Sequence, residues 1–375
     1  MKSVLITGIL GFIGRNLRQA LSRRPDIEIL GFDVQNDPAD LDKHLEKADV
    51  VFHLAGVNRP EQEAEFEEGN TELTRRICDF LEKSGKNPLL VFSSSTQAEF
   101  DNPYGRSKRK AEGVLAGFAE RTAAPVRIYR LPRVFGKWCR PNYNSVVATF
   151  CHNIARDLPI TITDPGREID LVHVDDVVAP FLKDMDNPPR PGVSWGDAAP
   201  IFRIALGDLS ERLHSYRLSR KTLLVPDSSD PLTRRLFSTF QSYLPVEALA
   251  YDLDMKKDGR GCLAELLKAP GFGQLFVSRT KPGVTRGNHY HDLKVEKFCV
   301  LEGDAVIRFR PVQGEHVIEY SISGKDFRVV DIPPGYTHTI ENVGKGELVT
   351  LFWANEPYDS NRPDTYPLIV CEGRQ

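Results

Sequence analysis

The sequence predicts an α/β domain with a doubly wound parallel sheet over residues 1–245, followed by an all-β barrel over residues 246–375. A chain of 375 residues is long for a single hydrophobic core. Apolar runs alternate with amphipathic stretches over the first 180 residues, which is typical of a parallel sheet with helices on both faces. From about Val246, short β-rich runs separated by glycine turns indicate a barrel or sandwich.

The expected strands of the first domain are short apolar runs that end at polar or glycine-rich turns. They cover residues 4–7, 27–32, 50–55, 89–93 and 126–131. The expected helices are the amphipathic stretches between and after them. They cover residues 11–22, 70–84, 104–122 and 143–156. Residues 202–243 have helical patterning and are expected to form a substrate-side lobe and connector.

The expected strands of the second domain are shorter and evenly spaced. They cover residues 273–279, 296–301, 305–311, 316–322 and 327–332. No internal repeat interrupts this pattern. Evenly spaced short strands of this kind favour a closed all-β fold.

Composition excludes several classes of protein. The formal net charge is −3 and charges of both signs are interspersed, so we expect no nucleic-acid partner. No apolar stretch approaches the roughly 20 residues that a membrane helix needs, and the first apolar run leads directly into a glycine turn, unlike a signal peptide. The six cysteines are far apart and form no CxxC pair. We therefore expect a cytoplasmic protein with reduced thiols and no membrane partner.

A glycine-rich turn, TGILGFIG at residues 7–14, follows the first strand and opens a helix. Glycines let the backbone approach a pyrophosphate, and the free N–H groups of the helix N-terminus favour an anion. Asp33 closes the next strand, where a carboxylate can hold the adenosine ribose. The turn after the third strand, Leu54 to Gly56, completes the expected nicotinamide site. The predicted cofactor-binding residues are Gly8, Gly11, Phe12, Ile13, Gly14, Arg15, Asp33, Leu54, Ala55, Gly56, Tyr104 and Lys108.

Three residues form the predicted catalytic group of this domain: Ser95, Tyr104 and Lys108. The tyrosine and lysine are four positions apart, so they lie on one helix face. A lysine ammonium beside a tyrosine lowers the phenol pKa, which makes the phenol a usable proton donor near neutral pH. The serine hydroxyl is expected to hydrogen-bond the reacting carbonyl. The alternative interpretation is an ordinary helix with an exposed pair, which the preceding serine-tipped strand disfavours.

Four residues in the second domain form a predicted metal site: His289, His291, Glu296 and His338. The first three lie in GVTRGNHYHDLKVE at residues 283–296, and the fourth in PPGYTHTIEN at residues 333–342. Alternate residues of a strand face the same side, so both early histidines can point into a barrel. This set suits Zn²⁺, Fe²⁺, Ni²⁺ or Mn²⁺. The alternative is a metal-free barrel that binds sugar or mediates dimerisation.

The first domain resembles the extended short-chain dehydrogenase/reductases. The motifs occur in family order: TGxxGxxG, HLAG at residues 53–56, SSS at 93–95, YxxxK at 104–108 and LVHVDD at 171–176. Arg133 stands where relatives often carry asparagine. Thr96 and Gln97 stand where related sugar dehydratases carry an Asp-Glu pair, so dehydration is not expected. The two reactions that the motifs still allow are reduction of a ketosugar and 4-epimerisation.

The second domain is similar to the cupins, and both halves together resemble the bifunctional capsular-polysaccharide and O-antigen enzymes of the CapF type. The stretches that carry this resemblance are residues 53–60, 101–105, 135–145, 335–338 and 361–366. It implies a homodimer with zinc and a UDP-linked amino-sugar substrate. The cupin then epimerises C3 of a UDP-2-acetamido-2,6-dideoxy-4-hexulose, and the reductase domain reduces C4 to UDP-N-acetyl-6-deoxy-L-talosamine, on the route to UDP-N-acetyl-L-fucosamine. The predicted substrate residues are Asn58, Arg59, Asn142 and Asn144.

Two questions stay open at the level of sequence. Asp33 would repel a 2′-phosphate and favour NADH, whereas Arg15 would attract it; the family resemblance implies NADPH. The alternatives to a bifunctional enzyme are a nucleotide-sugar 4-reductase or 4-epimerase with a structural or dimerising cupin, and a redox-sensing binder without catalysis.

Overall fold

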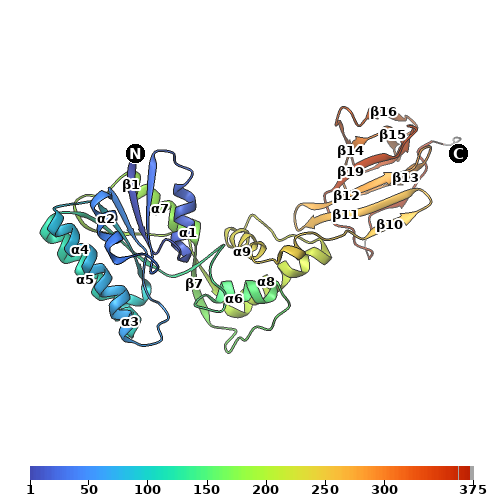
Figure 1. Ribbon diagram of the computed structural model, residues 1–375. Coiled ribbons are helices and arrows are strands. Elements are labelled where there is room, and N and C mark those ends of the chain that lie inside the picture. The colour runs from blue at the N-terminus through green and yellow to red at the C-terminus, as the bar shows by residue number, and fades with distance from the viewer. Residues whose placement is uncertain (362, 372–375) are drawn as a thin grey trace. The chain divides into compact units, whose positions relative to one another are not determined.

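The computed structural model describes residues 1–361 and 363–371 (Figure 1). Contacts within the chain define two compact units. The first unit comprises residues 1–214 and 235–245, and the second comprises residues 215–234 together with those from 246 onward. The segment 215–234 therefore packs with the second unit, although its sequence lies within the expected first domain.

The first unit contains a six-stranded parallel sheet in the order β2-β1-β3-β4-β5-β8. Its strands are β1 (Lys2–Thr7), β2 (Ile27–Phe32), β3 (Val50–His53), β4 (Leu89–Ser95), β5 (Pro125–Leu131) and β8 (Gly192–Gly196). The strand order reverses at β1, which pairs with both β2 and β3. In such sheets ligands bind beyond the carboxyl ends of the strands at this reversal point.

Helices cover both faces of this sheet (Figure 1). The helical elements are α1 (Phe12–Leu21), α2 (Pro38–Lys47), α3 (Ala64–Phe66), the π-helix η1 (Glu67–Glu72), α4 (Leu73–Ser84), the 3₁₀ turn η2 (Thr96–Glu99), α5 (Pro103–Thr122), α6 (Val146–Ile154) and α7 (Val174–Asp186). One apolar cluster joins the sheet to α2, α4 and α5, where Phe118 is fully buried. A second cluster joins the other face to α1 and α7 through Leu17 and Phe181. The predicted doubly wound fold is confirmed.

Two expected helices differ in their bounds for local reasons. The helix expected at residues 70–84 is α-helical only from Leu73, because a π-helical turn precedes it. The helix expected at residues 143–156 begins at Val146, where the Ser145 hydroxyl accepts a hydrogen bond from the Ala148 N–H and caps the N-terminus.

A smaller sheet in the first unit has the order β6-β7-β9. Its strands are β6 (Arg133–Phe135), β7 (Glu168–His173) and β9 (Ile201–Ala205). Strand β9 occupies the start of the stretch expected to be helical. The remainder of that stretch forms α8 (Leu206–Thr222) and α9 (Pro231–Gln241), followed by the short turn η3 (Val246–Ala248).

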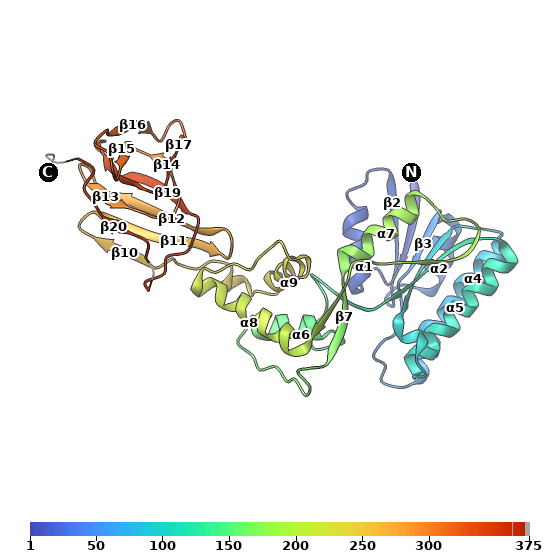
Figure 2. The same ribbon diagram turned by 180° about the vertical axis from the view of Figure 1, so that it is seen from behind.

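The second unit contains two antiparallel sheets, in the orders β10-β11-β12-β19-β14-β17 and β16-β15-β18-β13-β20 (Figure 2). The strands are β10 (Met255–Asp258), β11 (Gly261–Ala269), β12 (Gly273–Thr280), β13 (Thr285–Tyr290), β14 (Glu296–Glu302), β15 (Asp304–Pro311), β16 (Ile318–Ser323), β17 (Val329–Ile332), β18 (Tyr336–Asn342), β19 (Leu348–Ala354) and β20 (Tyr366–Pro367). Side chains from both sheets, including Phe298, Ile307 and Phe352, form one apolar core. The expected all-β second domain is confirmed.

In the described part of the chain, no helix is both long enough and apolar enough to span a membrane.

Candidate functional site

The glycine-rich turn packs closely against its own helix. Gly8 adopts a left-handed backbone conformation (φ +72°), and a Cβ at Gly14 would lie only 2.1 Å from the Gly8 carbonyl oxygen. The Gly11 N–H donates to that same oxygen at 2.9 Å. Phe12 and Ile13 begin α1 and pack their side chains on the apolar cluster, so only their backbone N–H groups face a ligand. The turn can therefore admit a pyrophosphate at the helix N-terminus.

Asp33 lies directly beside this turn. Its Oδ2 accepts a hydrogen bond from the Leu10 N–H at 2.8 Å, and its Oδ1 accepts one from the Val34 N–H at 2.9 Å. These contacts fix the carboxylate at the end of β2, where a ribose hydroxyl of a dinucleotide can donate to it.

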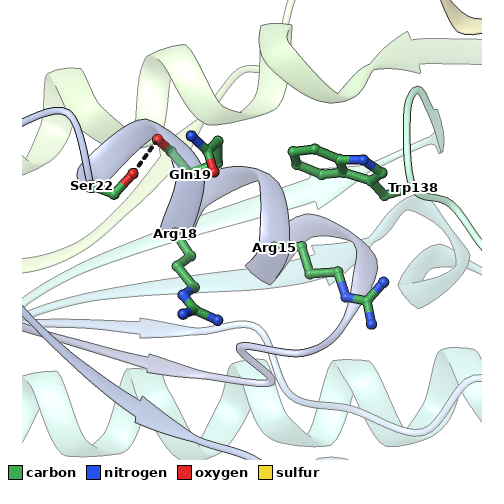
Figure 3. A pocket seen from close by; sticks show the side chains of 5 residues that line it. All are labelled: Arg15, Arg18, Gln19, Ser22 and Trp138. Atoms are coloured by element: carbon green, nitrogen blue, oxygen red, sulfur yellow. Dashed lines mark hydrogen bonds between the residues drawn. The ribbon is translucent and has the colours of Figure 1, made fainter. Parts of the chain in front are cut away.

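Arg15 is the residue that would attract the 2′-phosphate of NADPH. It lines a cavity of about 380 Å³ on the exposed side of α1 (Figure 3). Arg18, Gln19 and Ser22 of the same helix and Trp138 complete this lining. Asp33 is not among these residues. The two side chains that argue for different cofactors therefore lie in different surroundings.

Ser95 and Tyr104 come together because α5 starts close to the end of β4. The Asn102 side chain caps α5 by accepting from the Gly105 N–H at 2.8 Å. A Cβ at Gly105 would lie 2.1 Å from the Gln97 carbonyl oxygen, so glycine permits the helix to approach η2 this closely. The Ser95 hydroxyl consequently lies close enough to the Tyr104 phenol to interact with it. Lys108 follows one turn later and is 4% exposed.

The electrostatics of this group differ from the expectation in one respect. Burial raises the pKa of Tyr104, and the interaction with Ser95 only partly offsets it. Lys108 Nζ donates to the Ser93 carbonyl at 3.1 Å and lies 4.8 Å from the centre of the Phe92 ring. Burial lowers the pKa of Lys108 itself to about 8, against an opposing effect of Glu112. This lysine therefore changes protonation within the range where enzymes commonly work.

The turn after β3 lies against Lys108. A Cβ at Gly56 would be 3.1 Å from Lys108 Nζ and 2.7 Å from Asn70 Oδ1, so a larger residue there would displace one of these two side chains. Asn70, which the motif analysis missed, is buried in η1 and donates from Nδ2 to the Val57 carbonyl (3.0 Å) and the Ser107 hydroxyl (2.9 Å). Single π-helical turns are frequent at functional sites. Asn70 thus connects this turn to the helix that carries Lys108.

A buried chain of hydrogen bonds runs from the glycine turn to Asn70. The Thr7 hydroxyl accepts from the Ala55 N–H (3.2 Å) and contacts His53 Nδ1 (2.8 Å), while His53 Nε2 contacts the Thr74 hydroxyl (2.9 Å). That hydroxyl donates to the Asn70 carbonyl at 2.6 Å. Each hydroxyl has one proton, so Thr74 must accept from Nε2–H and Thr7 must donate to Nδ1. Burial and Lys108 lower the pKa of His53 to about 3, so this imidazole stays neutral.

The four predicted substrate residues lie on two loops. Asn58 and Arg59 follow β3, and Asn142 and Asn144 precede α6; all four are exposed. The structure joins the loops because Arg59 Nη1 donates to the Tyr143 carbonyl at 2.5 Å. Asn142 is held by its N–H, which donates to the Thr149 hydroxyl at 2.9 Å.

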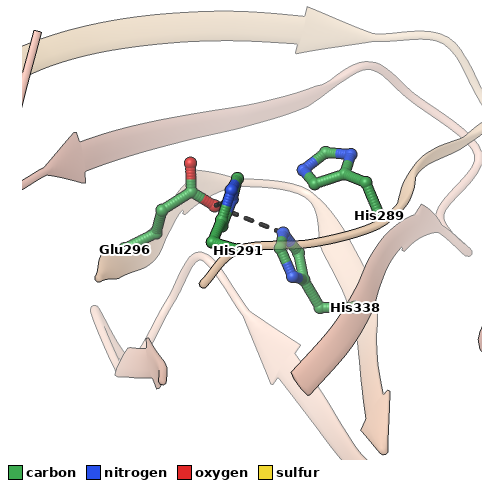
Figure 4. A group of neighbouring side chains, drawn as sticks. All are labelled: His289, His291, Glu296 and His338. Atoms are coloured by element: carbon green, nitrogen blue, oxygen red, sulfur yellow. Dashed lines mark ion pairs between the residues drawn. The ribbon is translucent and has the colours of Figure 1, made fainter. Parts of the chain in front are cut away.

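The four predicted metal ligands converge in the second unit (Figure 4). One ligand atom from each residue, His289, His291, Glu296 and His338, lies within 4.8 Å of the others. The register of β13 against β18 shifts between Gly287 and His289, which places His289 opposite His338. A Cβ at Gly287 would lie 2.5 Å from the His338 carbonyl oxygen. This bulge aims His289 into the cluster.

The donor set fits a divalent metal ion. The Nε2 atoms of His291 and His338 are buried without a hydrogen-bond partner in the described structure, and lie 3.4 and 3.2 Å from Glu296 Oε2 (Figure 4). Burial and the neighbouring His338 lower the pKa of His289 to about 4, so this imidazole is neutral. Although burial raises the pKa of Glu296, the adjacent imidazoles outweigh it and keep the carboxylate charged. Three imidazoles and one carboxylate are typical ligands of Zn²⁺ and similar ions.

Asp364 is the second residue that the motif analysis missed. Its carboxylate accepts from the backbone N–H groups of Asp292 (2.9 Å), Leu293 (3.0 Å) and Lys294 (2.8 Å). Its carbonyl oxygen accepts a hydrogen bond at 2.5 Å from Nδ1 of His291, which leaves Nε2 facing the cluster. The stretch 361–366 contains this residue; Arg362 in it lies outside the described residues.

We expect Asp364→Ala to weaken metal binding by about 10-fold or more, because it removes the carboxylate that holds the backbone of residues 292–294 and thereby fixes the carbonyl that orients His291. Competition with a chromogenic chelator measures the affinity. Asp359→Ala is the matched control, since Asp359 is exposed and its side chain accepts a hydrogen bond from the nearby Asn361 N–H. Equal affinities of the two variants would contradict the orienting role.

Comparison with known proteins assigns both parts of the chain. Residues 4–193 match the NAD dependent epimerase/dehydratase family, and residues 256–366 match the polysaccharide biosynthesis C-terminal domain. The UDP-glucuronic acid 4-epimerase from Bacillus cereus in complex with NAD is 19% identical with a TM-score of 0.52, covering 57% of this chain and 82% of that chain. This last similarity shows the fold alone.

Two relatives match over nearly the full length. A protein of Pseudomonas aeruginosa named UDP-2-acetamido-2,6-beta-L-arabino-hexul-4-ose reductase is 46% identical over 370 residues, covering 99% of each chain. The crystal structure of the capsular polysaccharide assembling protein CapF from Staphylococcus aureus superimposes with a TM-score of 0.91 and 44% identity, covering 98% of this chain and 100% of that one. The chain therefore belongs to the NAD dependent epimerase/dehydratase family and, within it, to the CapF type, in which a polysaccharide biosynthesis C-terminal domain follows the reductase fold.

Proposed function

We propose that this chain is a bifunctional nucleotide-sugar enzyme that acts on UDP-2-acetamido-2,6-dideoxy-4-hexulose. Residues 246–375 invert C3, and residues 1–245 reduce the C4 ketone with NADPH to give UDP-N-acetyl-6-deoxy-L-talosamine, a precursor of UDP-N-acetyl-L-fucosamine. The observation that carries the proposal is the serine–tyrosine–lysine group beside a dinucleotide turn, in a chain 46% identical over its length to a hexul-4-ose reductase.

The reductase residues have distinct parts in the proposed reduction. The nicotinamide supplies the hydride that adds to C4. Tyr104 donates its phenol proton to the C4 oxygen, so that the ketone becomes an alcohol. Ser95, whose hydroxyl lies beside the Tyr104 phenol, holds that oxygen within reach of the phenol. Lys108 is buried beside them and supplies a positive charge that favours the phenolate left behind.

The choice of NADPH rests on the resemblance to the family, and Asp33 is the residue that opposes it. We expect Asp33→Asn to raise the ratio of kcat/KM for NADPH to that for NADH by roughly tenfold or more, because it removes a negative charge facing the 2′-phosphate. Steady-state kinetics with both cofactors measure the ratio. An unchanged ratio would show that this carboxylate does not face the ribose. A much lower wild-type KM for NADH would overturn the choice of NADPH.

The cupin residues would hold a divalent ion, which we propose to be Zn²⁺, with Fe²⁺, Ni²⁺ and Mn²⁺ as alternatives. Such an ion supplies Lewis acidity, which makes a C–H next to a ketone acidic. Glu296 contributes the negative charge of the ligand set, and the buried faces of His291 and His338 shield the site from water. We further propose a cytoplasmic homodimer, for which sedimentation gives the oligomeric state.

The test is NADPH consumption and product NMR with UDP-2-acetamido-2,6-dideoxy-β-L-arabino-4-hexulose, using native and metal-stripped protein. We expect a C3-inverted, C4-reduced product that is uninverted or absent without metal. The same product with and without metal would instead indicate a 4-reductase with a structural cupin. Absence of NADPH consumption, with NADH also inactive, would overturn the reductase assignment.

A further inference from the structure

The segment after β3, residues 56–66, contacts the predicted catalytic residues at both of its ends. At its start, the backbone of Gly56 lies so close to Lys108 that a Cβ would be 3.1 Å from Nζ. At its end, the Phe66 ring lies 5.6 Å from the Tyr104 ring, centroid to centroid. Arg59 is exposed between these two anchors and is only three residues from Gly56. Three residues span at most about 10 Å, so the backbone of Arg59 stays close to the catalytic lysine.

A second loop, residues 136–145, faces the first. Its backbone is held by the Tyr243 hydroxyl, which donates to the Cys139 carbonyl at 2.5 Å, and by the Asn16 side chain, which donates to the Lys137 carbonyl at 3.3 Å. The loop presents Arg140 and Tyr143, both exposed. The first part of the loop is thus fixed, and its basic and aromatic side chains are exposed.

The two loops meet at Tyr143. Arg59 Nη1 donates to the Tyr143 carbonyl, and the Arg59 guanidinium carbon lies 5.9 Å from the centre of the Tyr143 ring. The guanidinium carbon of Arg140 lies 5.0 Å from the same centre. Two cations therefore share one aromatic ring at the edge of the reductase site.

These two cations lack the counter-charges that their neighbours have. In the same region Arg106 pairs with Asp101 (3.0 Å) and Glu63 (3.3 Å), and Lys137 pairs with Asp175 (3.0 Å). Across the residues that the structure describes, no carboxylate pairs with Arg59 or Arg140. Two neighbouring guanidinium groups repel each other unless an anion lies between them, and their planar donors match phosphate oxygens.

We infer that Arg59 and Arg140 bind the diphosphate of the sugar nucleotide and that Tyr143 holds the two guanidinium groups in place. This assignment rests on the proposed function, which puts C4 of the sugar at Tyr104. The diphosphate is attached at C1, across the sugar ring from C4. Arg59, between the anchors at Lys108 and Tyr104, is in the right region to contact it.

Calorimetric titration of the full chain with UDP and with uridine tests the inference. In Arg59→Ala and in Arg140→Ala we expect the Kd for UDP to rise about tenfold or more, the usual effect of losing a charged hydrogen bond. Affinities for uridine and NADPH should not change, and the latter reports intact folding. Lys137→Ala removes a charge from the same loop that is already neutralised by Asp175, and should leave UDP affinity unchanged.

Steady-state turnover of the 4-hexulose substrate distinguishes a failure of this inference from a failure of the proposed function. With a C4 ketone substrate, the arginine variants should show a higher KM and an unchanged kcat, because the diphosphate does not react. Wild-type turnover with unchanged KM and UDP affinity in both variants would overturn the inference alone. UDP affinity that depends on both arginines, without any wild-type turnover, would overturn the proposed function alone. The inference would also be overturned if the wild type did not bind UDP. The same holds if the arginine variants lost affinity for NADPH and kept their affinity for UDP.

Discussion

Tyr104→Phe is expected to lower the rate of ketone reduction by about 10²- to 10⁴-fold, the usual contribution of a positioned proton donor. The substitution removes only the hydroxyl, and the ring keeps its contact with Phe66, so the local packing is preserved. The Ser95 hydroxyl loses its partner but retains the hydrogen bond that it accepts from the Gln97 N–H at 3.1 Å. The loss should therefore be chemical rather than structural.

Single-turnover oxidation of NADPH measures this rate directly. NADPH affinity, determined separately, should stay within about twofold of the wild type, since the dinucleotide turn is untouched. Exchange of the C3 hydrogen with deuterium from solvent should also persist, because the proposal places that step in the cupin. Undiminished turnover would revive the alternative that the reductase fold only binds its cofactor.

The second large effect is expected from His338→Gln, which should abolish stoichiometric metal binding and C3 exchange while sparing hydride transfer. His338 is 1% exposed and its Nε2 is directed at Glu296, so a replacement cannot recover the ligand geometry. Metal content by mass spectrometry and deuterium incorporation at C3 provide the two readouts. His316→Gln, at an exposed histidine of the same unit, is the matched control.

Retention of both metal and C3 exchange in His338→Gln would exclude this cluster as the metal site. Retention of exchange without metal would place the epimerising chemistry on protein groups alone. Glu296→Gln removes the negative charge of the ligand set and preserves the side-chain volume. We expect this variant to lose the metal as well.

The features that the sequence predicted well are those with short-range spacing. The glycine turn and the Tyr104–Lys108 pair depend on a single turn or helix, so their geometry follows from local rules. The metal cluster required residues from β13, β14 and β18 and one, His291, just after β13, but cupin spacing places them in register. Both candidate sites therefore assemble from the predicted residues.

What the sequence did not reveal depends on tertiary contacts. His53 and Asn70 look like ordinary polar residues at element ends, and only packing shows that they form one buried hydrogen-bonded chain. Asp364 lies 73 positions from His291 and has no local signature. The contact of Lys108 with the Ser93 carbonyl was also not predicted, because it depends on how closely α5 approaches β4.

The bulge in β13 has a consequence for how the second domain can change over evolutionary time. Deleting Asn288 would keep His289 opposite His338, but it would remove two hydrogen bonds that Asn288 accepts: one from the Leu368 N–H to its carbonyl at 2.9 Å, and one from the Val370 N–H to its Oδ1 at 3.1 Å. A single-codon deletion there should be more harmful than most substitutions at the same position. Length variation among functional descendants of this chain should thus be absent between Gly287 and His291 and tolerated in distal turns such as residues 312–317.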